Sequence, residues 1–119
     1  MIDDQVQDRV LTVLRALKAH TLTGAIEWQL TDRQTYQTSV ERSSFAVGTR
    51  DGDGLAPFNF TMYDSSGNPV ANVATGDGDF GAPVVGAVED LFMSVHLNTG
   101  RMISLLDRAI KELGDVPPF

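Results

Sequence analysis

The sequence predicts an α+β fold in which an antiparallel sheet of about five strands is covered on one face by two helices. Apolar residues recur every three or four positions near both ends of the chain, and every second position between them. The connections between the period-two segments are too short for parallel crossovers. With 119 residues, 42% of them hydrophobic, the chain is expected to form one domain with one core over residues 1–119.

The first helix is expected over residues 4–19. Its apolar positions follow the helical period and therefore share one face. These positions are Val6, Val10, Val13, Leu14 and Leu17. Asp4 is expected to cap the first turn, with Gln7 three residues later completing a capping box. Arg15 and Lys18 lie near the C-terminal end, where basic residues stabilise the helix dipole.

Strands are expected over residues 24–30, 36–41, 44–49, 58–63 and 70–74. In each of them apolar and polar side chains alternate, as on a strand with one buried face. Ile26, Trp28 and Leu30 are expected to share the inner face of the first strand. Residues 64–69 have the composition of a turn. Because consecutive strands are joined by short connections, an antiparallel meander follows.

A long second helix is expected over residues 83–113. Pro83 suits its first turn, and the apolar stripe continues almost in phase across Gly100. One helix, bent or weakened near Gly100, is favoured over two separate helices, because a glycine costs a helix only about 1 kcal/mol. Gly114 and the prolines after it end the helix, and residues 114–119 are expected to form a mobile tail.

A helix of that length would extend beyond its own domain. Residues 83–113 would span roughly 45 Å, which exceeds the width of a compact domain of this size. The distal part would expose an apolar stripe, and such stripes normally contact a partner. The expected interface residues are Met102, Leu105, Leu106, Ile110 and Leu113. A homodimer formed through the C-terminal helix is therefore predicted.

Negative charge is concentrated in the second half of the chain. Residues 51–100 contain seven acidic side chains and no Lys or Arg, whereas acids and bases balance elsewhere, so this stretch accounts for the formal charge of −7. An acidic chain repels phosphate backbones, which argues against nucleic-acid binding. Such a surface favours a basic protein as partner.

Four of these acids lie in two Gly/Asp loops, residues 51–54 and 76–79. They are Asp51, Asp53, Asp77 and Asp79. The loops flank the hairpin of the last two strands at its open end, so they are expected near the same edge of the sheet. Oxygen-rich loops suit Ca²⁺, although neither loop matches an EF-hand. Asp and Gly are also ordinary turn formers, and solvated turns are the favoured interpretation.

No catalytic motif is recognisable, and no cofactor is expected. The chain has no cysteine and only two histidines. It lacks the G-x-S-x-G nucleophile elbow and the phosphate-binding glycine motifs. The first residues, Met1 to Asp4, are acidic where a signal peptide is basic, and no apolar run is long enough to span a membrane. A cytoplasmic protein is therefore expected.

These observations favour a non-catalytic protein-interaction module, of adaptor, chaperone-like or immunity type, over an enzyme. The alternative is a small-molecule or Ca²⁺-binding module that uses the two Gly/Asp loops. The two hypotheses require different features of the fold. Partner binding needs the apolar stripe of the C-terminal helix to be exposed, whereas cation binding needs the loop carboxylates to converge.

Overall fold

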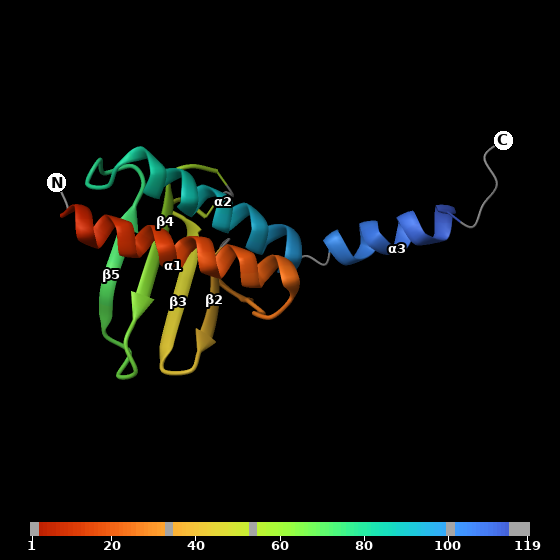
Figure 1. The fold of residues 1–119 in the computed structure, drawn as a ribbon, viewed down its shortest axis with the longest axis horizontal. Coiled ribbons are helices and arrows are strands. Elements are labelled where there is room, and N and C mark those ends of the chain that lie inside the picture. Colours follow the sequence, from red (N-terminus) through yellow and green to blue (C-terminus); the bar gives the residue numbers. More distant parts are fainter. Residues whose placement is uncertain (1–2, 33–34, 53–54, 100–101, 115–119) are drawn as a thin grey trace.

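The computed structural model describes residues 3–32, 35–52, 55–99 and 102–114, and it has the predicted α+β architecture (Figure 1). The elements are α1 (Asp4–Thr23), β1 (Gln29–Asp32), β2 (Thr35–Val40), β3 (Ser43–Thr49), β4 (Phe58–Tyr63), β5 (Pro69–Ala74), α2 (Ala82–Thr99) and α3 (Met102–Gly114). The five strands form one antiparallel sheet in the order β1-β2-β3-β4-β5. Each strand thus pairs with its neighbour in sequence, which confirms the predicted meander.

Helices α1 and α2 pack side by side on one face of the sheet (Figure 1). Their apolar faces and the inner face of the sheet form one core. Its buried side chains are Val10, Leu14 and Leu17 from α1, Trp28, Tyr36, Phe45, Val47, Phe58, Phe60 and Val73 from the sheet side, and Val84, Val88, Leu91, Phe92 and Val95 from α2. Among the helices of the described residues, none is both long and apolar enough to cross a bilayer.

The first strand differs from its prediction. Helix α1 continues to Thr23 and ends at Gly24, whose φ of 81° lies in the left-handed region that glycine adopts readily. Strand β1 therefore begins at Gln29 instead of residue 24. Trp28 is buried as predicted, but Leu30 is 57% exposed. The prediction that these two side chains share an inner strand face was wrong, because Trp28 precedes the strand and strand alternation does not place it.

The start of α1 also differs. The N-cap is Asp3, whose carboxylate accepts a hydrogen bond from the backbone N–H of Gln5 at 2.8 Å. Asp4 is instead the first helical residue. The Gln7 side chain accepts a hydrogen bond from the backbone N–H of Gly81 at 2.9 Å. This contact ties the first turns of α1 to the loop that precedes α2.

The structure has two C-terminal helices where the sequence favoured one. Helix α2 ends at Thr99 and α3 begins at Met102, while residues 100–101 and the tail 115–119 lie outside the described residues. Asn98 and Thr99 are weak helix formers, and the Asn98 side chain is bonded to α1. Helix α3 projects away from the rest of the domain (Figure 1). The radius of gyration is accordingly 16.2 Å, against about 13.5 Å for a compact domain of this length.

Candidate functional site

Helix α3 presents an uncovered apolar face. The side chains of Leu106, Ile110 and Leu113 are 55%, 67% and 69% exposed, and their spacing places them on one side of the helix. Among the described elements, α2 is the neighbour that α3 contacts appreciably. Met102 and Leu105, also predicted at this interface, belong to α3, but their side chains lie outside the described residues.

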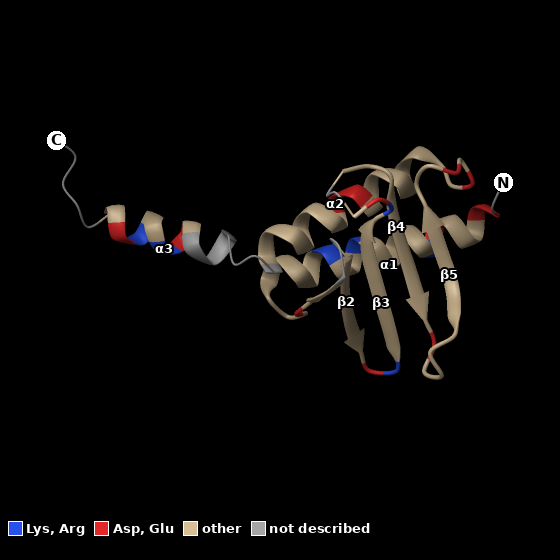
Figure 2. Ribbon diagram, turned by 180° about the vertical axis from the view of Figure 1, so that it is seen from behind, with Lys and Arg blue, Asp and Glu red and all other residues tan. Residues whose placement is uncertain are grey.

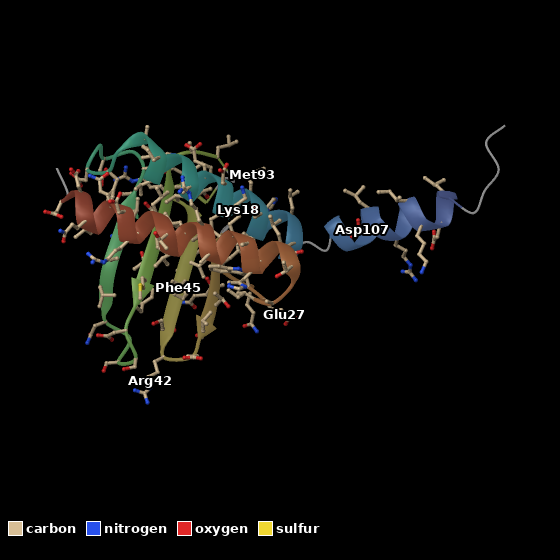
Figure 3. The ribbon with its side chains drawn as sticks, viewed as in Figure 1. Lys18, Glu27, Arg42, Phe45, Met93 and Asp107 are labelled. Carbon is tan, nitrogen blue, oxygen red and sulfur yellow. The ribbon has the colours of Figure 1, made fainter. Side chains whose placement is uncertain are left out.

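The polar side of α3 is electrically balanced. Residues 102–114 contain two acids and two bases, in a chain whose formal charge is −7. Arg108 Nε lies 3.5 Å from Glu112 Oε1, one helical turn away. Figure 2 shows both signs of charge on α3, and Figure 3 shows its side chains, Asp107 among them, standing clear of the sheet and of α1. Two copies of this helix can therefore approach each other without net repulsion.

The two Gly/Asp loops begin at the same end of the sheet, after β3 and after β5. The backbone N–H of Arg50 donates to the carbonyl of Pro57 at 2.9 Å, and the N–H of Thr75 donates to the carbonyl of Phe58 at 2.9 Å. Arg50 Nη1 lies 3.7 Å from Asp77 Oδ1, and both side chains are about half exposed. A guanidinium that lies one residue outside the acidic stretch therefore contacts one of its carboxylates.

The four loop carboxylates are only partly placed. Asp51 and Asp79 are exposed, Asp77 contacts Arg50, and Asp53 lies outside the described residues. Within the described ranges, no three Asp, Glu or His side chains come close enough to hold a metal ion. The structure thus places both loops at one end of the sheet and shows no carboxylate cluster among the described residues, and the Ca²⁺ site stays a prediction.

A tyrosine–histidine contact joins the sheet to α2. Tyr36 Oη lies 2.6 Å from His96 Nδ1, and the imidazole stacks on Phe92 with ring centroids 5.7 Å apart. A tyrosine hydroxyl is protonated at neutral pH, and burial raises the pKa of the Tyr36 hydroxyl further above its ordinary value. The hydroxyl can then donate to Nδ1, with the imidazole proton on Nε2. In this arrangement the hydrogen bond between Tyr36 and His96 connects β2 to α2.

A second buried polar network lies where α1 and α2 end together. Trp28 Nε1 donates to Thr21 Oγ1 at 2.9 Å, and that hydroxyl donates to the carbonyl of Leu17 at 2.6 Å. Asn98 Nδ2 donates to the carbonyl of Thr21 at 2.8 Å. The network fixes the last turn of α2 against α1, and with it the point from which the chain continues to α3. Sequence reasoning missed it, because a single Thr at a helix end has no distinctive pattern.

The sheet itself is almost free of charge. Of the residues in its five strands, only Asp32 on β1 is charged. Figure 2 shows acidic and basic residues in the turns and on the helices, while the strands seen from the uncovered face are uncharged. Arg42 lies at the tip of the β2–β3 hairpin, and its side chain points away from the sheet (Figure 3). The uncharged strands therefore leave surfaces that another chain can approach without burying a charge.

Comparisons with protein-family models, with curated proteins and with solved structures found no match to this chain. The features that bear on function are the apolar face of α3, the end of the sheet that carries both Gly/Asp loops, and the uncharged strands.

Proposed function

We propose that this chain is a non-catalytic protein-interaction module that forms a homodimer through α3. The observation that carries the proposal is the apolar face formed by Leu106, Ile110 and Leu113, which is exposed in the single chain. Burying one such side chain contributes about 1.5–3 kcal/mol. Three of them on one short helix therefore provide a substantial driving force for association.

The length of α3 supports the same proposal. The helix has 13 residues, and isolated helices shorter than about 12–15 residues are only marginally stable in water. The described apolar side chains of α3 are more than half exposed, so a stable α3 needs apolar surface from elsewhere. A second copy of α3 supplies that surface, and the balanced charge of the helix permits the approach.

Replacing both Leu106 and Ile110 with aspartate is expected to convert a dimer into a monomer. Charged side chains cannot be buried at the interface without a large desolvation cost. The melting temperature of the double variant should be close to that of the wild-type chain, because neither side chain belongs to the core. Sedimentation equilibrium at micromolar concentration measures the first effect and circular dichroism melting the second.

Lys111→Asp is the matched control for this experiment. It changes the net charge by the same amount as the double variant, but it lies on the polar side of α3 and leaves the apolar face intact. The control should remain dimeric. A wild-type chain that sediments as a monomer at micromolar concentration contradicts the proposal, as does a double variant that remains dimeric.

The alternative function, Ca²⁺ binding, is favoured by the position of both Gly/Asp loops at the same end of the sheet, where Arg50, beside the first loop, contacts Asp77 of the second. A cation there competes with the Arg50 guanidinium for Asp77, so Arg50→Gln is expected to strengthen binding. Millimolar Ca²⁺ should raise the melting temperature, since a ligand that binds only the folded state stabilises it. Asp77→Asn should abolish that increase. An unchanged melting temperature in both wild type and Arg50→Gln rules out this alternative.

A further inference from the structure

Strand β5 forms an open edge of the sheet. It pairs with β4 and with no other strand of the described residues. The backbone N–H of Thr75 donates to the carbonyl of Phe58, which makes these two residues a hydrogen-bonded pair. Bonded and non-bonded pairs alternate along an antiparallel ladder. The backbone N–H and C=O of Asn72, three residues before Thr75, therefore point away from β4, toward the open edge.

The two edges of the sheet differ in how they are protected. Exposed edges are usually blunted by short strands, charges, prolines or bulges. Strand β1 has only four residues, an irregular register and Asp32. In β5, by contrast, Pro69 and a register irregularity both lie at the hairpin end. Residues 71–74 have no charge and no proline, so this part of the edge can accept another strand.

Helix α1 extends past this edge. Its first turns reach beyond β5 in Figure 1. Val6 follows the helical spacing of the buried Val10 and Leu14, yet its side chain is 46% exposed. The bond between Gln7 and Gly81 holds these turns in place. A sixth strand beside β5 would lie on the side toward which these turns extend (Figure 1), where it could cover Val6.

The surroundings of the edge are acidic. Asp64 lies in the turn before β5, and Asp3 and Asp4 open α1 (Figure 2). The loop after β5 contains Asp79 and Asp77, of which Asp77 contacts Arg50. If two copies of β5 paired antiparallel, the Asp64 end of each strand would lie beside the acidic loop of the other. Like charges in such positions oppose pairing. A segment with positive charges at its ends is instead attracted.

We propose that the β5 edge binds an extended, basic segment of a partner protein as a sixth strand of the sheet. The segment would form backbone hydrogen bonds with Asn72, cover Val6 with an apolar side chain, and place Lys or Arg near the acids at the two ends of β5. This inference names the partner of the interaction module proposed above and so rests on that function. It uses a surface separate from α3.

The test uses a fluorescent peptide of about ten residues, the upper length of common strands. It alternates valine and threonine and has lysines at both ends. Anisotropy should show saturable binding to the wild-type chain at micromolar peptide, weakened by added salt because the charges are exposed. A matched peptide with glutamates in place of the lysines should bind at least about tenfold more weakly, a difference typical of charge complementarity.

Asn72→Pro tests the site on the protein. Proline removes the backbone N–H that points to the open edge. It does not remove a hydrogen bond between β5 and β4, so the sheet should persist. Binding of the lysine peptide should fall about tenfold, equivalent to about 1.4 kcal/mol. Asn72→Thr keeps the backbone N–H and should bind as wild type does. A peptide that is N-methylated at alternate residues lacks backbone hydrogen-bond donors and should bind poorly to the wild-type chain. This measurement tests the proposal even if the Asn72→Pro variant fails to fold.

Several results would overturn the proposal. They are absence of peptide binding, equal binding of the lysine and glutamate peptides, and unchanged binding by a folded Asn72→Pro variant or by the N-methylated peptide. Loss of a wild-type dimer in Asn72→Pro would also overturn it, since β5 would then pair with a second copy. The Leu106/Ile110 double aspartate variant should bind the peptide as wild type does, so failure of the dimer proposal can be told apart from failure of this one.

Discussion

Replacing Phe92 with alanine is expected to lower the free energy of unfolding by about 3–5 kcal/mol, a large part of the roughly 5–15 kcal/mol that stabilises a domain. Phe92 is almost fully buried. Its ring centroid lies 5.0 Å from that of Phe58 and 6.0 Å from that of Tyr36. The substitution leaves a cavity between α2 and the sheet, where packed neighbours on both sides relax only partly.

Urea unfolding, followed by the fluorescence of Trp28, measures this effect. Phe92→Leu keeps much of the buried volume and should cost less than the alanine variant. Met93→Ala is a neighbouring control, since Met93 is exposed on the same helix and should cost less than about 0.5 kcal/mol. Equal costs for Phe92→Ala and Met93→Ala contradict the packing of α2 against the sheet.

Replacing Thr21 with valine is expected to cost about 1–3 kcal/mol. Valine keeps the branched shape but removes the hydroxyl that accepts the hydrogen bond from Trp28 Nε1. The indole N–H is then buried without an acceptor, and this desolvation is the source of the cost. Urea unfolding is again the measurement. Thr21→Ser, which retains the hydroxyl, should cost less than Thr21→Val, and the opposite order would exclude the hydrogen bond as the main cause.

Local periodicity was sufficient to predict most of this fold. The alternation of apolar and polar side chains predicted residues 58–63 as a strand, and β4 has those bounds. Short connections predicted the meander, because only antiparallel neighbours can be joined that way. Periodicity predicts the bounds of a strand wrongly when a residue just outside the strand also fits its alternation of apolar and polar side chains. Trp28 matched the alternation of Leu30 but belongs to the chain between α1 and β1.

The remaining differences depend on contacts between residues far apart in sequence. The stripe across Gly100 has a helical period on both sides, and nothing local in it shows that Asn98 bonds to Thr21. The contact of Tyr36 with His96 likewise depends on how β2 packs against α2.

For the candidate sites, composition predicted the residue types but not their neighbours. The sequence placed Asp77 in an acidic stretch, whereas the fold places it beside Arg50. The exposed stripe of α3 was predicted, since Leu106, Ile110 and Leu113 share a helical face whatever the rest of the chain does. The edge position of β5 follows from the meander order. The exposure of Val6 could not be predicted, because its spacing matches that of the buried Val10 and Leu14.

The packing of α1 against α2 sets an order of events during synthesis. Residues 24–81, which include the whole sheet, are made between the end of α1 and the start of α2. At about 5–20 residues per second their synthesis takes roughly 3–12 s. The hairpins can pair successively in that interval, because each strand needs only the one made before it. The apolar face of α1 is synthesised first. Its burial is complete only after α2 has been synthesised, because α2 is the element that α1 contacts most extensively.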